Sequence, residues 1–228
     1  MRELMTAAGV RIETYETDEP VPQDTTADYV IKRIDPLSSE EIFALTETGY
    51  RFLDRMLFMD IDLKSTAAQR AATVRRAGDI EYSVDEDFSG IYALAGASYV
   101  SDRRFHLDPV FSMEKAIPVL DAYIGYYRDR GAKIVKAKHE EELLGCCVID
   151  LNADPKGKYF ENVLGATIPG IKGKLIAAQL YNYMLEFCSD RFARYRGRVS
   201  ASNLASVNLH INLGAKVSQI YDELILSR

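Results

Sequence analysis

The chain has 228 residues, of which 47% are apolar and 27% are charged, a composition typical of a globular protein with a substantial core. Its net charge of -6 argues against nonspecific binding to nucleic acid, and no apolar run approaches the length of a membrane span. The first residues lack the apolar core of a signal peptide, so we expect a cytoplasmic protein with no nucleic-acid or membrane partner.

The first third of the chain is predicted to form a small unit of strands and one helix. Its elements are, in chain order, a polar lead-in over 1–28 with a short strand at 10–15, a strand at 29–34, a helix from Ser38 or Ser39 to Gly49, and a strand over 52–63. Helix, glycine and strand recur near the other end of the chain, around Gly214. This echo is either a structural repeat or only the common use of glycine at a left-handed helix end.

Residues 66–78 are rich in alanine and arginine and are predicted to connect this unit to the rest of the chain. The elements that follow are a short strand at 79–82, a helix begun by Asp85 or Ser89 that runs to Tyr99, a helix from Ser112 to Gly131, a hairpin of 133–137 with 142–151, and a strand over 159–168. Cys146 and Cys147 are adjacent in the hairpin, so their side chains point to opposite faces and cannot readily share a disulfide or a metal ion. We expect them and Cys188 to be buried thiols in a reducing compartment, with no metal site.

The most informative stretch runs from Gly165 to Gly214. A strand leads through Pro169 into the loop Lys172-Gly173-Lys174, and a long helix over 175–191 follows. Backbone N–H groups at such a junction point outward, and the helix dipole adds partial positive charge there, so the junction suits a phosphate group. The apolar stripe of the helix comprises Ile176, Leu180, Tyr183, Met184 and Phe187, and it is predicted to pack in the core.

A second strand and a short helix complete this stretch. Asn203 stands at the start of the helix and is a favoured capping residue, and His210 follows two turns later. Seven residues is close to two helical turns, so the two side chains are predicted to share a face and to address one extended ligand. The pattern predicts a site for a long, phosphate-headed cofactor with an acid near its reactive end.

This arrangement resembles the GNAT acyltransferase family, which transfers an acetyl group from acetyl-CoA to an amine. The pyrophosphate loop of that family runs along 166–177, where Lys172 takes the place of the usual Arg, Gly173 fits, and Leu175 replaces a usual Gly. The second hallmark runs along 203–215, where His210 replaces the usual Tyr and Ala215 the usual Phe. A weaker likeness covers Tyr92 to Arg130, where residues 101–109 resemble the TDP-fucosamine acetyltransferase branch, which acetylates an amino sugar linked to a nucleotide.

The resemblance implies a mixed α/β fold with a largely antiparallel sheet flanked by helices. It implies an acetyl-CoA-binding domain over 81–228, preceded by a small N-terminal α/β subdomain at 1–65 and a connector at 66–80. The cofactor-binding candidates are the strand residues Gly165, Ala166 and Thr167, the loop residues Ile171, Lys172, Gly173, Lys174, Leu175 and Ile176, and Asn203. Leu175 would either crowd the pyrophosphate or turn into the core beneath the helix.

Two residues are candidates for the chemistry. His210 would protonate the departing thiolate, as the Tyr of the family does, although a packed helix histidine is the alternative. Glu161 is the best candidate for a general base, and Tyr159 or a chain of waters would serve as well. No general base is needed on the chain if water carries the proton.

The predicted function is that of an acetyl-CoA-dependent N-acetyltransferase in which the amine attacks the thioester directly. The acceptor would be a small amine, with an amino sugar linked to a nucleotide as the first choice and an amino acid, a polyamine or a protein amino group as others. A non-catalytic GNAT-like module that senses a ligand or binds a partner is the alternative from a different class. The oligomeric state is left open, with a homodimer as one alternative.

Overall fold

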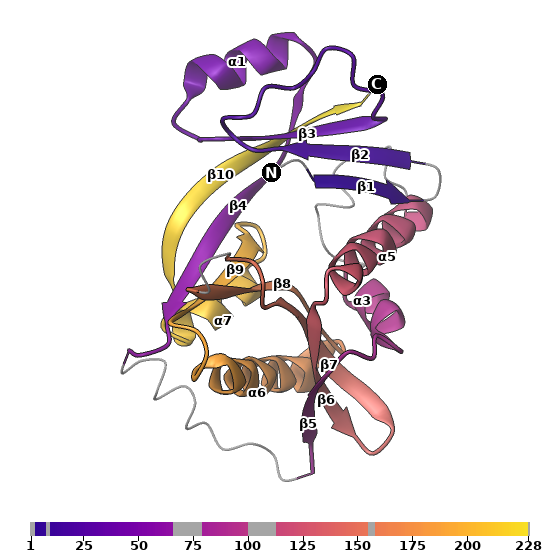
Figure 1. Cartoon of the computed structure of the whole chain (residues 1–228), viewed down its shortest axis with the longest axis vertical. Coiled ribbons are helices and arrows are strands. Elements are labelled where there is room, and N and C mark those ends of the chain that lie inside the picture. The colour runs from indigo at the N-terminus through magenta and orange to yellow at the C-terminus, as the bar shows by residue number, and fades with distance from the viewer. Residues whose placement is uncertain (1–2, 8–9, 66–78, 100–112, 155–157, 228) are drawn as a thin grey trace.

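A computed structural model describes residues 3–7, 10–65, 79–99, 113–154 and 158–227 of the chain (Figure 1). The described strands are β1 (Glu3–Ala7), β2 (Val10–Tyr15), β3 (Tyr29–Ile34), β4 (Arg51–Asp62), β5 (Glu81–Asp85), β6 (Lys133–His139), β7 (Glu142–Asp150), β8 (Tyr159–Thr167), β9 (Arg194–Ser200) and β10 (Lys216–Ser227). They form a single mixed sheet in the order β1-β2-β3-β10-β4-β9-β8-β7-β6-β5. Neighbouring strands are antiparallel except in the pairs β2/β3 and β8/β9, which are parallel.

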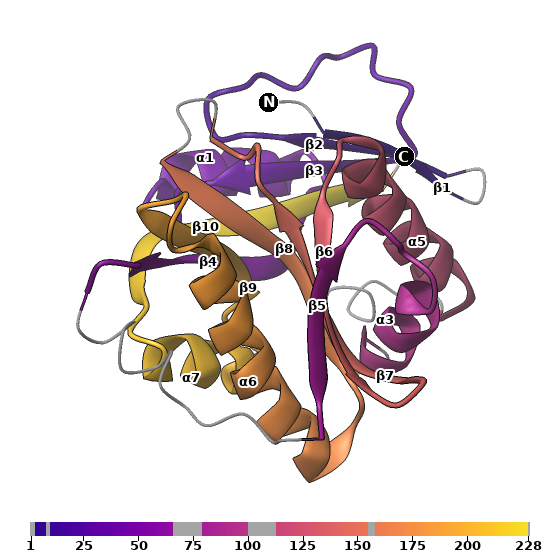
Figure 2. The ribbon, with the colours of Figure 1, turned by 60° about the horizontal axis from the view of Figure 1, so that its bottom comes forward.

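Helices cover both faces of the sheet (Figure 2). The described helices are α1 (Ser39–Glu47), α3 (Ile91–Tyr99), α5 (Met113–Asp129), α6 (Gly170–Cys188) and α7 (Leu204–Asn212). Helix α6 packs on one face over a core that contains Phe160, Leu180 and Met184. Helices α3 and α5 pack on the other face over a second core that contains Ile91, Ile124 and Leu164. The fold is therefore a mixed α/β fold with a mostly antiparallel sheet, as the sequence predicts.

The first and last parts of the sheet repeat one pattern. In β1-β2-β3-α1-β4 and in β7-β8-β9-α7-β10, an antiparallel hairpin is followed by a parallel strand, a helix and a long strand. Gly49 and Gly214 end the two helices with positive φ angles of 94° and 89°, which favour glycine. The predicted echo is thus a repeat of topology. The two repeats differ in the connection to the parallel strand. In the second repeat α6 connects β8 to β9, whereas in the first repeat residues 16–28 connect β2 to β3 through turns and extended chain.

The long strands of the two repeats are exchanged. Strand β10 pairs with β3 and β4 pairs with β9, so each repeat is completed by the last strand of the other. The two exchanged strands also pair with each other from Lys216↔Asp60 to Ile225↔Arg51. The predicted boundaries at 65 and 81 stay a prediction, since most of the connector lies outside the described residues. The sheet itself runs through both parts of the chain.

Most elements lie where the sequence predicts them, apart from small shifts at their ends, with two differences. Strand β1 was not expected, because the polar lead-in shows only one clear alternating run. Helix α6 begins at Gly170, five residues before the expected start at Leu175, so the predicted loop Lys172-Gly173-Lys174 is the first turn of the helix. None of the described helices is long and apolar enough to cross a membrane.

The cysteines are buried, as the sequence predicts. Cys146 faces the core beneath α3 and α5, whereas Cys147 and Cys188 both lie in the core beneath α6. All three are free thiols. Burial raises the pKa of Cys146 and of Cys188 to about 12. Thiolates, the reactive forms, are therefore strongly disfavoured at these positions.

Candidate active site

The site begins where the parallel strands β8 and β9 separate. They pair with each other from Tyr159↔Arg194 to Asn162↔Gly197. Strand β8 then continues to Thr167 and β9 to Ser200 without pairing to each other, and both stretches lie within the described range 158–227. The two strands thus form a V whose point is at Asn162 and Gly197. Figure 1 shows α6 beside this V, on the side away from α3 and α5.

The three strand residues predicted to line the cofactor lie on the open arm of β8. The side chain of Ala166 is buried in the core beneath α3 and α5. Gly165 faces the other way, towards α6, and a Cβ built there would lie 2.8 Å from Tyr181 Oη. Any larger residue at position 165 would displace the Tyr181 ring. Thr167 also faces α6, near Ile176 and Leu180.

The open arm of β8 leads into the start of α6. Pro169 is the N-cap residue, with extended backbone, and its side chain cannot accept a hydrogen bond from the first turn. The first turn contains no acidic residue. The N-cap residue therefore gives the leading N–H groups no side-chain cap, and these groups carry the positive end of the helix dipole. Lys172 and Lys174 belong to this turn, so the chain concentrates positive charge at the end of the open arm.

Gly173 makes the tight turn from strand to helix sterically feasible. A Cβ built at this residue would lie 1.8 Å from the carbonyl oxygen of Ile168 and 3.1 Å from Thr167 Oγ1. The obstacle at 1.8 Å is backbone, so it cannot move aside without shifting the end of β8. Local packing alone therefore requires glycine at position 173, whether or not a ligand also requires it.

We expect Gly173→Ala to destabilise the junction and to abolish binding of acetyl-CoA. The methyl group would push the first turn of α6 away from β8 and disturb the N–H groups that are predicted to bind phosphate. Gly96→Ala is the matched control, because Gly96 also lies in a helix and a Cβ there meets nothing within 4 Å. It should leave binding unchanged and stabilise the fold by about 0.5 kcal/mol. Thermal melting and titration with acetyl-CoA measure both effects. Normal binding by Gly173→Ala would contradict this account of the turn.

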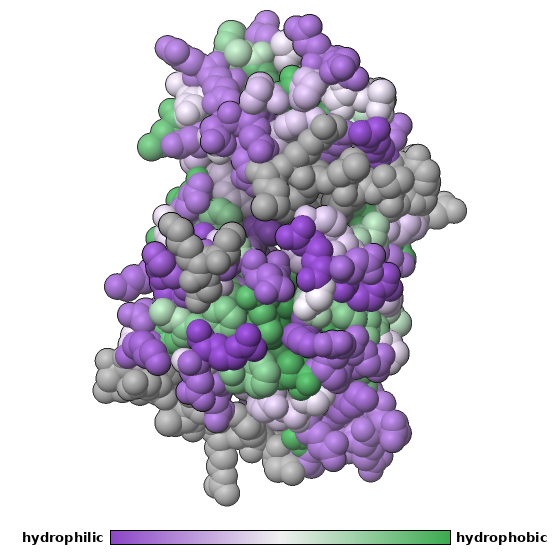
Figure 3. Space-filling view, viewed as in Figure 1, coloured by the Kyte–Doolittle hydropathy of each residue, from purple (hydrophilic) through white to green (hydrophobic). Residues whose placement is uncertain are grey.

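Leu175 and Ile176 take opposite directions from α6. Leu175 is 63% exposed, so it does not turn into the core beneath the helix, which removes one of its two predicted positions. Ile176 is buried in the core beneath α6. Figure 3 shows apolar residues at the surface at the level of α6, with polar residues above and below them. The side chains of Ile171, Lys172 and Lys174 lie outside the described part of the structure.

Asn203 caps α7 as predicted. Its side-chain oxygen accepts a hydrogen bond from the Ser206 N–H at 3.0 Å, and the residue is exposed. Its predicted second role, bonding to the cofactor arm, stays a prediction. The two residues differ in exposure to solvent, because Asn203 is exposed whereas His210 is only 1% exposed.

His210 is enclosed by hydrogen bonds on both ring nitrogens. Nδ1 lies 2.8 Å from the Ser206 carbonyl oxygen, and Nε2 lies 2.7 Å from Tyr195 Oη. The carbonyl can only accept, so Nδ1 carries the proton and Nε2 accepts one from the Tyr195 hydroxyl. Burial lowers the pKa of His210, and the Ser206 carbonyl opposes this effect. The histidine is therefore neutral near neutral pH.

A neutral buried histidine makes stability depend on pH in a defined direction. The unfolded imidazole binds a proton as the pH falls through about 6.5, whereas the folded ring stays neutral to a lower pH. Stability should thus fall on acidification below about 6.5, by up to about 1.4 kcal/mol per pH unit. We expect His210→Gln to lose this part of the pH dependence. His139→Gln is the control, because the side chain of His139 is 43% exposed. Urea unfolding between pH 5 and 8 measures the three slopes, and equal slopes for His210→Gln and the parent would contradict the buried neutral state.

Three residues near His210 were not singled out in the sequence. Asn162 on β8, Tyr181 on α6 and Tyr195 on β9 are all buried around the point of the V. The Asn162 side-chain amide, with its oxygen towards Tyr181, accepts from Tyr181 Oη at 2.7 Å and donates to the carbonyl oxygens of Leu164 and Val148. Neither tyrosine is distinguished in the sequence, because nothing in a helical or an alternating pattern separates a functional phenol from a packed one.

Glu161 lies on the opposite face of the sheet from this cluster. Its neighbour Phe160 packs beneath α6, so Glu161 points towards α5. Its carboxylate forms an ion pair with Arg198, and Arg198 also donates to Tyr127 Oη of α5 at 2.9 Å. Next to it, Arg196 binds Asp60 through two hydrogen bonds of 2.9 Å and stacks over Tyr159. The two predicted catalytic residues are thus placed on opposite sides of the V.

The chain has the fold of the GNAT acyltransferases, as comparison with solved structures shows. A tandem GNAT protein from the clavulanic acid biosynthesis pathway matches with a TM-score of 0.60 and 12% identity, over 87% of this chain and 63% of that one. A putative GNAT acetyltransferase from Novosphingobium aromaticivorans matches with a TM-score of 0.54 and 15% identity, over 90% of this chain and 76% of that one. A functionally unknown conserved protein from Staphylococcus epidermidis matches with a TM-score of 0.64 and 12% identity, over 98% of this chain and 87% of that one.

These likenesses concern the fold. The chain spans less than two thirds of the length of the tandem protein. No protein-family model matches the sequence, and no curated protein matches it either.

Proposed function

We propose that this protein is an acyl-CoA-dependent N-acyltransferase that uses acetyl-CoA and a small amine. The observation that carries the proposal is the separation of β8 from β9, which leads directly into the uncapped, basic start of α6. The open arm of β8 forms a path that joins two places. The start of α6 at one end suits a pyrophosphate, and the point of the V between β8 and β9 lies at the other end. A long cofactor with a charged head and an extended arm fits that shape.

The residues that would hold the cofactor follow from this path. The first turn of α6, from Ile171 to Lys174, would receive the pyrophosphate, and the open arm of β8 at Gly165, Ala166 and Thr167 would receive the pantetheine chain. Asn203, exposed at the start of α7, would bond to the same chain. The thioester would then lie near the point of the V.

Direct attack by the amine is the mechanism that suits this site. A route through an acylated cysteine is disfavoured, because all three cysteines are buried and raised pKa values keep their thiols protonated. The amine would approach from the face of Glu161, which would take its proton, directly or through water. Arg198 would hold the Glu161 carboxylate in place. The departing sulfur would lie nearer the opposite face, where the cluster around His210 is found.

The acceptor remains a small amine of unassigned identity. An amino sugar linked to a nucleotide is the first candidate, through the likeness at 101–109, and these residues lie outside the described part of the structure. An amino acid, a polyamine and a protein amino group are the other candidates. A panel of these amines, assayed for release of free CoA thiol from acetyl-CoA, would identify the class.

Calorimetric titration with acetyl-CoA tests the proposal. Saturable binding, together with amine-dependent release of CoA, would support the enzyme. The alternative is a non-catalytic GNAT-like module, which the exposed Leu175 in the phosphate motif and the buried His210 favour. Binding without turnover by any amine would support a ligand-sensing module, and no binding at millimolar acetyl-CoA would overturn the cofactor site.

A further inference from the structure

Tyr181 is the buried polar residue of α6 that reaches the open arm of β8. It lies three helical turns from the start of the helix, and its side chain is directed at Gly165, three residues beyond the last β8–β9 pair. From Lys172 to Tyr181 the helix rises by about 14 Å. A cofactor bound by its pyrophosphate at the first turn would therefore extend its arm towards the Tyr181 hydroxyl.

Both strands of the V lack side chains where phenol groups approach them. A Cβ at Gly165 would lie 2.8 Å from Tyr181 Oη, and a Cβ at Gly197 would lie 2.5 Å from Tyr195 Oη and 2.8 Å from His210 Nε2. The hydroxyl groups thus rest against bare backbone at the point of the V. Replacing either glycine would push these groups out of the place where the two strands part.

The three polar rings are not equivalent. Tyr195 precedes the last pair of β9, is fully buried, and donates to His210 Nε2. His210 is anchored behind it on the Ser206 carbonyl. Tyr181 instead faces the part of β8 that β9 has left, and its hydroxyl is held by Asn162 at 2.7 Å. Tyr181 is therefore the ring that a thioester in the V would meet first.

The rings are connected by hydrogen bonds and by ring contacts. Tyr195 donates to His210, Tyr181 donates to Asn162, and the Tyr181 and Tyr195 rings pack edge to face with centroids 6.4 Å apart. Burial raises the pKa of Tyr195 far above its ordinary value, which keeps its phenol protonated. His210 and Tyr195 thus form a rigid support behind Tyr181.

We propose that Tyr181 is the acid that protonates the departing CoA thiolate, and that His210 acts through Tyr195 as a positioning residue. This inference rests on the proposed acyltransferase function. The amine nitrogen attacks the carbonyl carbon, and the carbon–sulfur bond breaks with its electron pair on sulfur. The Tyr181 hydroxyl, which donates to the Asn162 oxygen before the reaction, turns to sulfur and gives it the phenolic proton. The proton that Glu161 takes from the amine returns to the Tyr181 phenolate through water, so the step balances without another reactant.

The thiol of bound CoA provides a test that needs no acceptor. A phenol donating to sulfur stabilises the thiolate, so it lowers the thiol pKa of bound CoA. We expect Tyr181→Phe to bind CoA with parent affinity and to raise this pKa by about one unit, measured from thiolate absorbance against pH. With an amine found in the acceptor panel, kcat should fall about 100-fold. Tyr183→Phe is the control, because Tyr183 lies on the same helix but stacks on Tyr82 of β5.

His210→Phe separates the two roles. Because His210 only positions the acid, His210→Phe should lower kcat less than Tyr181→Phe does. The remaining activity should still fall at high pH, where the Tyr181 phenol loses its proton. A full loss in His210→Phe with parent activity in Tyr181→Phe would overturn the proposal and assign the acid to His210. An unchanged thiol pKa in Tyr181→Phe would also overturn it, as would a loss of CoA affinity without a change in kcat. Failure of the parent to bind CoA would instead refute the proposed function.

Discussion

Reversing the charges of Lys172 and Lys174 together to glutamate is expected to weaken acetyl-CoA binding by about 100-fold or more at low salt, close to 3 kcal/mol. Both residues lie in the first turn of α6, where uncapped N–H groups and the helix dipole already favour an anion. The double change replaces two attractions for phosphate by two repulsions. The loss should shrink as salt is added, because salt screens the attraction between lysine and phosphate charges.

The same double change should stabilise the folded protein. Lysine at a helix N-terminus opposes the dipole, and α6 has no acidic residue in its first turn to offset this. Glutamates there should contribute about 0.3–1 kcal/mol each. A raised melting temperature together with lost binding would indicate that the two lysines serve ligand binding at a cost to stability. Parent affinity in the folded variant at low salt would refute the phosphate site.

Lys158→Glu with Lys216→Glu is the matched control. Both lysines are exposed, and the double change alters the net charge by the same amount. Lys158 precedes β8 at the end of the strand opposite the start of α6, and Lys216 pairs with Asp60 at that same end of the sheet. This variant should bind acetyl-CoA nearly as the parent does. An equal loss in both variants would indicate a general charge effect.

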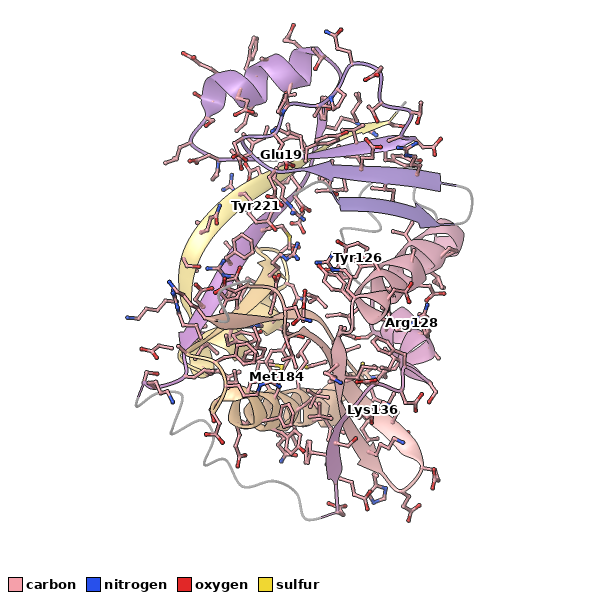
Figure 4. All side chains as sticks on the ribbon, in the orientation of Figure 1. Glu19, Tyr126, Arg128, Lys136, Met184 and Tyr221 are labelled. Atoms are coloured by element: carbon pink, nitrogen blue, oxygen red, sulfur yellow. The ribbon has the colours of Figure 1, made fainter. Side chains whose placement is uncertain are left out.

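Replacing Met184 with aspartate is expected to destabilise the protein by about 4 kcal/mol or more. Met184 is fully buried beneath α6, so the change would place an unpaired carboxylate in the core (Figure 4). Phe187→Asp is the matched control on the same helix, because Phe187 is 43% exposed. Its effect should be below about 1 kcal/mol. Chemical unfolding measures both, and similar losses in the two variants would mean that the buried face has been misassigned.

The contrast between Met184 and Phe187 shows how far helical spacing can be trusted. The sequence predicts one stripe that contains both residues, and it is right for Ile176, Leu180 and Met184 but wrong for Phe187. The last turns of the helix bury Leu185 and Cys188 instead. Periodicity locates a buried face, whereas the angle at which it meets the sheet depends on distant strands.

Most of the fold and the first part of the site could be predicted from short stretches of sequence. Asn203 is recognisable as a cap because a side-chain oxygen at that position completes the helix end, and Gly49 and Gly214 mark helix ends through a conformation that favours glycine. The phosphate turn follows from the order of strand, proline and glycine. These features depend on a few neighbouring residues, so the sequence alone contains them.

The interior of the site depends on contacts between distant residues. His210 on α7 is hydrogen-bonded by Tyr195 on β9. Gly165 has no room for a side chain because Tyr181 on α6 lies against it. Nothing near His210 in the sequence shows that its ring faces the core. The exchange of β4 and β10 was hidden for the same reason, because strand partners are chosen by the whole sheet.

That exchange has a consequence for how the protein is made. Strand β10 supplies partners to both β3 and β4, which are synthesised long before it, and Asp222 pairs with Ile34 across most of the chain. While the ribosome is still translating the region after α7, neither early strand has its native neighbour on that side. We expect the sheet to close only after β10 emerges, at a rate limited by these long-range contacts. Until then the early strands expose edges that other chains can pair with, so chaperone binding during synthesis should concentrate on β3 and β4.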